Sequence, residues 1–242
     1  MEAVLLAGGR GRRLVPFTIV FPKPLAPIGD VPIIDIILHQ LRNHGIKKVH
    51  ISVGYLSALI EAYLATRGGV AGLSIAYIRE STPLGTAGPA QMLAHQAQPV
   101  LVLNGDLLTT FDFRRFIAFY EEERPAIAIA VQRRRTSVDF GVIETSATGE
   151  VTGYLEKPSL EHLCSMGINI YSPEALAAMD PGETLDFPAL VDRMLGQGGR
   201  VLVFEHDGYW MDIGRREDYE RAIDDWPSLR ASLMGESEAG SP

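Results

Sequence analysis

The sequence holds few of the residues that build covalent or metal-based scaffolds. Cys164 is the only cysteine among the 242 residues, which excludes an internal disulfide framework and a cysteine-rich zinc site. Such low cysteine usage is typical of proteins kept in a reducing compartment. The six histidines form no His-Glu-x-x-His pair, so the helical zinc motif of metalloproteases is absent as well.

Long apolar runs and an excess of positive charge are also missing. The first apolar run, residues 3–7, is too short for a signal peptide and leads directly into glycine and arginine. No run approaches the roughly 18 apolar residues of a membrane span. The net charge of −8 argues against nucleic acid or an anionic membrane as the main partner, because proteins that bind them present basic surfaces. We therefore expect a cytoplasmic protein that binds neither.

The chain does contain enough apolar residues for one complete core, since 46% of its residues are hydrophobic. Apolar patterning and turn residues predict strands at 3–6, 49–53, 73–78, 100–103 and 126–131. Helices are predicted between them at 33–41, 57–65, 86–96 and 112–123. This alternating order implies a mostly parallel sheet with helices on both faces.

The second half of the chain has a different pattern. Residues 140–144 and 151–156 flank a Ser-Ala-Thr-Gly turn and predict a hairpin, and 166–171 predicts a further strand. Helices at 173–179, 187–195 and 216–223 and a strand at 201–204 complete the prediction. The run Arg133–Arg135 is assigned to a solvated turn. The small, polar tail at 235–242 is expected to be disordered.

The stretch from Leu5 to Ile28 carries the strongest chemical signal. An apolar strand stops at Gly8 and Gly9, and these glycines with Gly11 allow the backbone to turn its N–H groups toward an anion. Four cations follow within the same stretch, namely Arg10, Arg12, Arg13 and Lys23. Neither the Gly-Lys-Ser/Thr of a P-loop nor the third glycine of a dinucleotide fingerprint is present. The prolines at 16, 22, 24 and 27 predict an extended, helix-free loop over a polyphosphate.

The pattern G-G-x-G-x-R-L-x-P-x-T-x-x-x-P-K-P-L at residues 8–25 resembles the signature of the sugar-1-phosphate nucleotidyltransferases. The similarity is greatest to the mannose-1-phosphate and heptose-1-phosphate guanylyltransferases. It implies an α/β, Rossmann-like three-layer α/β/α fold with a mixed, mostly parallel sheet. It also implies a single catalytic domain at 1–234, with nucleotide bound by 1–131 and sugar phosphate by 132–234. Arg13 and Lys23 match the catalytic cations of that family.

Two aspartates are candidate metal ligands. Asp106 follows the apolar strand at 100–103, so its carboxylate is expected at the carboxyl edge of the sheet, where open α/β folds bind ligands. The resemblance places a metal-binding aspartate there and a second one at Asp212, within Trp-Met-Asp-Ile-Gly. Mg²⁺ typically takes one or two carboxylates together with phosphate oxygens. We therefore expect Mg²⁺ as the cofactor.

The resemblance also assigns the remaining site residues. The expected nucleotide-binding residues are Leu6, Ala7, Gly8, Gly9, Gly11, Glu80, Gly85, Thr86 and Asn104. The expected sugar-phosphate-binding residues are Gly141, Glu156, Lys157 and Gly167. Within the Glu-Lys-Pro segment at 156–158, the lysine would meet the sugar phosphate and the glutamate the sugar hydroxyls. Gly141 would let the sugar approach the backbone.

The implied reaction is transfer of a nucleoside monophosphate from an NTP to a sugar 1-phosphate. Glu80 favours GTP, because a carboxylate only accepts hydrogen bonds and guanine presents N1–H and N2–H side by side. Alternatively Glu80 points to solvent and the backbone around Gly85 reads the base, and transfer from dTTP or UTP stays open. A non-catalytic subunit on the same fold is a third hypothesis, although the charged positions are all present. The sequence leaves the oligomeric state open, including a homo-oligomer.

Overall fold

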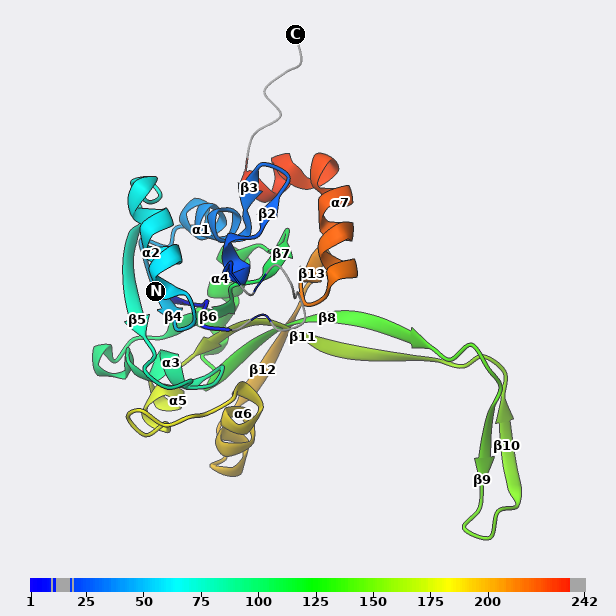
Figure 1. Ribbon diagram of the computed structural model, residues 1–242. Coiled ribbons are helices and arrows are strands. Elements are labelled where there is room, and N and C mark those ends of the chain that lie inside the picture. Colours follow the sequence, from blue (N-terminus) through cyan, green and yellow to red (C-terminus); the bar gives the residue numbers. More distant parts are fainter. Residues whose placement is uncertain (10, 12–17, 19, 236–242) are drawn as a thin grey trace.

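The computed structural model describes residues 1–9, 11, 18 and 20–235. Within these residues, seven strands form one sheet in the order β12-β8-β11-β6-β1-β4-β5 (Figure 1). The strands are β1 (Glu2–Leu6), β4 (Lys48–Val53), β5 (Ser74–Arg79), β6 (Val100–Asn104), β8 (Ile127–Ser137), β11 (Ser159–Tyr171) and β12 (Val201–Glu205). Neighbouring strands pair in parallel except at β11, which is antiparallel to both β6 and β8. The expected mixed, mostly parallel sheet is confirmed.

Helices cover both faces of the sheet (Figure 1). One face packs against α1 (Ile33–Asn43), α2 (Ser57–Thr66), α4 (Phe113–Glu123) and α7 (Arg216–Met234). The other packs against the shorter α3 (Gly88–Gln91), α5 (Pro173–Ala177) and α6 (Phe187–Gly196). Successive side chains of a strand point to opposite faces, so Ala3 and Leu5 belong to the first core while Val4 belongs to the second. The result is a three-layer fold.

The predicted helix over 86–96 is wrong. The segment contains only α3 and a 3-10 turn, η4 (Ala94–Gln96). The N–H groups of Ala87 and Gly88 donate to the Leu185 carbonyl (2.9 and 3.2 Å) rather than starting a helix. Long-range packing therefore overrides the local helical pattern. At the other end of the chain, the predicted helix over 216–223 is longer and extends as α7 to Met234.

Two short two-stranded ladders lie outside the main sheet. β7 (Leu107–Thr109) pairs antiparallel with β13 (Trp210–Asp212), and β2 (Pro27–Ile28) pairs with β3 (Val31–Pro32). The described part of the proline-rich loop includes the 3-10 turn η3 (Lys23–Leu25), where an extended, helix-free path was expected. Because the β7–β13 ladder aligns Asp212 with Leu107, two distant parts of the chain meet immediately after β6.

Residues 133–163 form a projection that we call the arm. β8 pairs with β12 only as far as Val131, and beyond that point Arg133–Ser137 pair with Ser159–Leu163 alone. At its end lies the predicted hairpin, formed by β9 (Val142–Thr145) and β10 (Val151–Leu155), away from the body of the protein (Figure 1). The hairpin is confirmed.

The turn predicted at Arg133–Arg135 is wrong, because these residues lie within β8. Their side chains alternate between two faces of the arm and find different partners. The Arg133 guanidinium pairs with Glu205 at 2.8 Å and the Arg135 guanidinium with Glu161 at 2.8 Å. A run of like charges is tolerated in this strand because each of these two cations has an acidic partner.

The expected disordered tail lies, from residue 236 on, outside the described residues, and Gly235 caps α7 in the left-handed conformation. The division of the domain at residue 131 into nucleotide and sugar-phosphate parts stays a prediction. Along the described part of the chain, none of the helices combines the length and the apolar character needed to cross a membrane.

Candidate active site

The carboxyl ends of the parallel strands β1, β4, β5 and β6 meet at one edge of the sheet, as expected for a ligand site in an open α/β fold. At this edge, backbone hydrogen bonds connect the residue that follows β1 to β4, and the residue that follows β6 to β1. The Ala7 N–H donates to the Ser52 carbonyl at 2.8 Å, and the Gly105 N–H donates to the Leu6 carbonyl at 2.9 Å. These bonds fix the backbone immediately before the glycine loop and immediately before Asp106.

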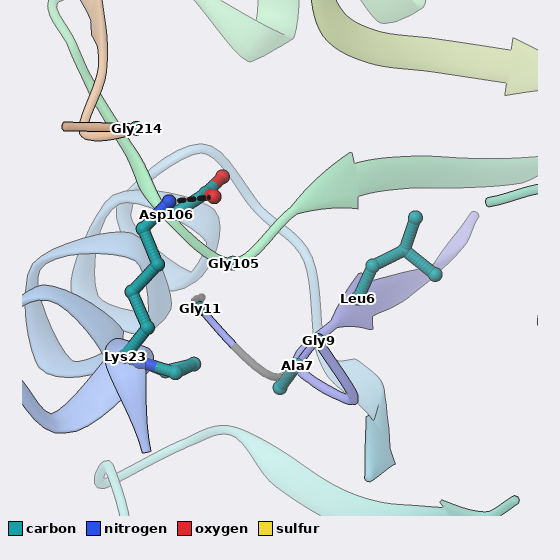
Figure 2. A pocket seen from close by; sticks show the side chains of 9 residues that line it. Leu6, Ala7, Gly9, Gly11, Lys23, Gly105, Asp106 and Gly214 are labelled. Carbon is teal, nitrogen blue, oxygen red and sulfur yellow. Dashed lines mark hydrogen bonds and ion pairs between the residues drawn. The ribbon is translucent and has the colours of Figure 1, made fainter. Parts of the chain in front are cut away.

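Two adjoining hollows lie along this edge. The first hollow is lined by Leu6, Ala7, Gly9, Gly11, Lys23, Pro24, Gly105, Asp106 and Gly214 (Figure 2). The second hollow is lined by Gly8, Gly9, Gly11, Gly54, Tyr55, Glu80, Ser81 and Pro83. Gly9 and Gly11 border both hollows. The glycine loop thus separates a site rich in charged groups from a second site beside Glu80.

Lys23 is the charged centre of the first hollow. Its side chain is buried, and its ammonium group donates a hydrogen bond to the Asp106 carboxylate (Figure 2). The ammonium also lies 3.8 Å from Asp212 Oδ1. The β7–β13 ladder brings the two aspartates together, and the Ile213 N–H donates to the Asp106 carbonyl at 3.0 Å. One cation and two carboxylates from three separate segments therefore converge.

The Asp106 carboxylate is incompletely satisfied. Its Oδ1 is buried and has no hydrogen-bond partner among the described residues. A buried carboxylate oxygen without a partner is costly, so it marks a place where a bound cation or donor would be stabilised. Among the described residues, no group of three or more aspartate, glutamate, histidine or cysteine side chains is arranged so that it could hold a metal ion. Two carboxylates fit Mg²⁺, which commonly takes its other ligands from phosphates and water.

Gly105 is required by the close approach of two strand ends. A Cβ at this position would lie 2.6 Å from the Leu6 carbonyl oxygen, which itself accepts the Gly105 N–H. The backbone segments at Leu6 and Gly105 could therefore move apart to make room for a Cβ only by breaking that hydrogen bond. Since Asp106 follows directly, the glycine fixes the place of the carboxylate.

We expect Gly105→Ala to lower the free energy of unfolding by about 1 to 3 kcal/mol, the usual cost of an overpacked backbone contact. Denaturant titration of the purified variant would measure it. Gly196→Ala is the matched control, because a Cβ at Gly196 in α6 meets nothing within 4 Å. That control should be neutral or slightly more stable. Equal unfolding midpoints for wild type and Gly105→Ala would contradict the expectation.

Glu80 lies beside the glycine loop at the second hollow. The Ser52 hydroxyl donates to its Oε1, and the Leu84 N–H donates to its Oε2 at 2.8 Å. A Cβ on Gly8 would lie 2.9 Å from Oε1. The carboxylate is therefore held in one orientation, and each oxygen keeps capacity to accept a further hydrogen bond.

The other expected nucleotide residues have structural partners. The Thr86 N–H donates to Asp186 Oδ1 at 3.1 Å, and the Thr86 hydroxyl accepts from the Phe187 N–H at 2.8 Å. Gly85 adopts a positive φ of 78°, and a Cβ there would collide with the Leu185 carbonyl. Among the described residues that line the two hollows, neither position appears. Their roles in binding stay predictions.

Asn104 and Gly167 lie side by side on β6 and β11. Gly167 has a φ of 72°, and a Cβ there would lie 2.5 Å from the Asn104 amide nitrogen. The structure thus brings together one residue expected to bind nucleotide and one expected to bind sugar phosphate.

The remaining sugar-phosphate candidates, Gly141, Glu156 and Lys157, flank the β9–β10 hairpin of the arm, which projects from the body of the protein (Figure 1). None of these three described residues lines either hollow. The Tyr154 hydroxyl donates to Glu156 Oε2 at 2.9 Å, and the Tyr154 ring fills the space where a Cβ on Gly141 would stand. Lys157 adopts a positive φ of 45°, a strained conformation for a non-glycine residue. Arg13 lies outside the described residues.

The sequence analysis assigned no binding role to several residues that line the hollows. They are Pro24, Gly54, Tyr55, Ser81, Pro83, Gly105 and Gly214. A usable signal existed for some of them, because Gly54 directly follows a predicted parallel strand, and the carboxyl ends of such strands form the site.

The carboxyl edge of the sheet in this three-layer α/β fold carries a glycine loop, a buried lysine and two aspartates. Such a site is suited to hold phosphorylated ligands. The family model described as "Nucleotidyl transferase" matches residues 2–228. The chain belongs to this family.

Curated relatives support the same assignment. The chain is 31% identical over 233 residues to "Mannose-1-phosphate guanylyltransferase catalytic subunit beta" of Xenopus tropicalis. The match covers 90% of this chain and 62% of that relative. The chain thus spans less than two thirds of the length of the curated relatives it matches.

Solved structures confirm the Rossmann-like fold. HddC from Yersinia pseudotuberculosis superposes with a TM-score of 0.72 at 25% sequence identity, covering 93% of this chain and 99% of that one. HddC complexed with GMP-PN gives a TM-score of 0.71 at 23% identity, with the same coverage. At 23% identity, the match to the GMP-PN complex shows a similar fold and nothing more.

Proposed function

We propose that the chain transfers GMP from GTP to a sugar 1-phosphate of the mannose- or heptose-1-phosphate type and releases pyrophosphate. The observation that carries this proposal is the buried Lys23 ammonium between Asp106 and Asp212, beside the glycine loop. The name of the Xenopus tropicalis relative supports the choice of a guanylyl group and of a sugar 1-phosphate.

The proposed reaction brings two anions together, so charge cancellation is the main task of the protein. A sugar phosphate oxygen attacks the α-phosphorus of the nucleotide, and pyrophosphate leaves in line, so no side chain has to act as the nucleophile. Lys23 would face the charge that develops on the transferred phosphate, and Arg13 is proposed for the same role. A cation held in a buried site acts more strongly than one in water.

Asp106 and Asp212 are the residues that would hold Mg²⁺. The unpartnered Asp106 oxygen and the second carboxylate near Lys23 support this assignment. When bound, Mg²⁺ would neutralise phosphate charge and help orient the triphosphate. The Lys23 ammonium already neutralises part of the charge of the Asp106 carboxylate.

The sugar 1-phosphate is proposed to contact Gly167 at the edge of the sheet and Gly141, Glu156 and Lys157 from the arm. The Lys157 ammonium would pair with the phosphate, and the Glu156 carboxylate would accept from sugar hydroxyls. Residues 1–131 would thus bind mainly the nucleotide, and residues 132–234 mainly the sugar phosphate.

Guanine is the proposed base because Glu80 presents a fixed carboxylate at the second hollow. We expect Glu80→Gln to reduce the preference for GTP over dTTP and UTP by about tenfold to a hundredfold, since an amide can satisfy a pyrimidine where a carboxylate repels its carbonyl oxygen. The measurement is the ratio of kcat/KM for the competing nucleotides. Glu123→Gln, which changes a carboxylate paired with Arg200 on the surface, is the control and should leave the ratio unchanged. An unaltered ratio in Glu80→Gln would show that the base is read elsewhere.

The function itself is tested by measuring pyrophosphate release for each nucleoside triphosphate with a panel of sugar 1-phosphates. GTP with mannose or heptose 1-phosphate is expected to give the highest kcat/KM. A higher kcat/KM with dTTP or UTP would favour the alternative of thymidylyl or uridylyl transfer. Failure of every pair to release pyrophosphate would favour a non-catalytic subunit.

A further inference from the structure

The arm concentrates exposed apolar side chains. Eight of the sixteen large hydrophobic side chains exposed in the described part of the chain lie between residues 138 and 163. They are Val138, Phe140, Ile143, Val151, Tyr154, Leu155, Leu160 and Leu163. Exposed apolar patches of this kind mark interaction surfaces, and an isolated two-stranded hairpin is only marginally stable in water. We therefore expect the arm to pack against a protein surface.

One face of the terminal hairpin carries both apolar groups and a proposed sugar-binding group. Ile143 and Tyr154 are directly paired across β9 and β10, so they share a face, and they are 56% and 63% exposed. The Tyr154 hydroxyl reaches Glu156 at 2.9 Å. Docking this face on a protein surface would therefore place Glu156 and its neighbour Lys157 at the same interface.

The arm is held in its direction by contacts at its start, where β8 stops pairing with β12. The Arg134 guanidinium stacks over the Trp210 ring at 4.9 Å and donates to the Trp210 carbonyl at 2.9 Å. The Gln132 amide donates to the Gly208 carbonyl at 2.7 Å. These bonds hold β8 in line with its extension, so the hairpin projects outward (Figure 1).

We propose that the arm docks on a second copy of this chain and supplies Glu156 and Lys157 to the sugar-phosphate site of that copy. The inference rests on the proposed function for the role of these two residues. Under two-fold symmetry each arm would serve the opposite body, so both sites would be completed and both apolar arms covered.

The body offers a matching surface beside the first hollow. Val20 is 73% exposed, and Phe21 is also exposed, just before Lys23 in the chain. Tyr55, at the second hollow, is exposed as well.

Mixing two inactive variants tests where the arm acts. Lys157→Ala removes the arm group and leaves the body intact, and Lys23→Ala does the reverse. Differently tagged copies of the two variants are co-expressed, and the mixed dimer is isolated by sequential affinity steps. If arms are exchanged, the intact arm serves the intact body, and the mixed dimer should show about half of the wild-type activity because one of two symmetric sites is restored.

Each outcome of the mixing experiment decides the question. A mixed dimer as inactive as its two parents would overturn the inference, because the arm would then serve only its own chain. A Lys157→Ala homodimer with wild-type activity would also overturn it, because the arm would bring nothing to the site.

Light scattering during size-exclusion chromatography tests docking without any assay of activity, so it separates this inference from the proposed function. The 242-residue protein should be a dimer, and Ile143→Asp should shift it to a monomer by placing a charge in the apolar face. Leu195→Asp in α6, where the leucine is 55% exposed, is the matched control and should remain dimeric. A monomeric wild type, or a dimer unaffected by Ile143→Asp, would contradict arm docking even if pyrophosphate release is observed.

Discussion

Replacing Lys23 by alanine should lower kcat/KM by on the order of a hundredfold or more, because it removes a desolvated cation from the place where phosphate charge is proposed to develop. Lys23 is buried and lies against two carboxylates. The substitution therefore also leaves Asp106 and Asp212 facing each other without their common counter-ion, which should weaken binding of the triphosphate. Steady-state kinetics with saturating Mg²⁺ would separate the loss in kcat from the rise in KM.

Lys48→Ala is the matched control for that experiment. Lys48 pairs with Glu2 at 3.2 Å at the start of β4, at the opposite end of the strand from the site. Removing a partly exposed ion pair of this kind costs about 1 kcal/mol of stability, and turnover should be unchanged. Near-wild-type kcat/KM in Lys23→Ala would remove the lysine from the proposed chemistry.

Asp106→Asn should suppress turnover by a comparable factor and raise the Mg²⁺ concentration needed for half-maximal activity. An amide has the shape of the carboxylate but lacks the charge that a hard cation prefers. Asp212→Asn should act in the same direction. The change also removes the carboxylate partner of the Lys23 ammonium, so the variant tests the two charges as one unit.

Calorimetric titration of Mg²⁺ into the protein with a non-hydrolysable nucleotide gives a readout that does not depend on turnover. Asp106→Asn should weaken this binding, whereas Asp224→Asn, at an exposed position in α7, should not. EDTA should abolish pyrophosphate release by the wild-type protein. Full activity in EDTA, or unchanged Mg²⁺ affinity in Asp106→Asn, would exclude the metal assignment.

The sequence predicted the glycine loop, Lys23 and Asp106 because each belongs to a local pattern. The apolar strands ending at Leu6 and Asn104 are readable from a few neighbouring residues, and their parallel pairing places both ends at one edge. The contact between Lys23 and Asp212 spans most of the chain and depends on the β7–β13 ladder. No local pattern carries that information.

The failed helix prediction has a similar cause. Residues 86–96 have a helical pattern, but Ala87 and Gly88 bond to Leu185. The hairpin of the arm was predictable from the two strand-like segments that flank a turn. The direction in which the arm projects was not, because it depends on contacts between distant residues, such as that of Arg134 with Trp210. The sequence assigned Glu156 and Lys157 to the sugar-phosphate site and left the oligomeric state open, and no local pattern showed that these residues follow a hairpin outside the main sheet.

The bonds between residues 84–87 and 184–187 tie the segment that orients Glu80 to a part of the chain that is synthesised about 100 residues later. Thr86 and Asp186 are 100 residues apart, and the Leu185 N–H also donates to the Leu84 carbonyl at 2.9 Å. Leu84 in turn holds Glu80. The segment that orients Glu80 therefore lacks its support until residue 187 has left the ribosome. Contacts of such long sequence separation slow folding, and we therefore expect the nascent first half to be an incomplete folding unit.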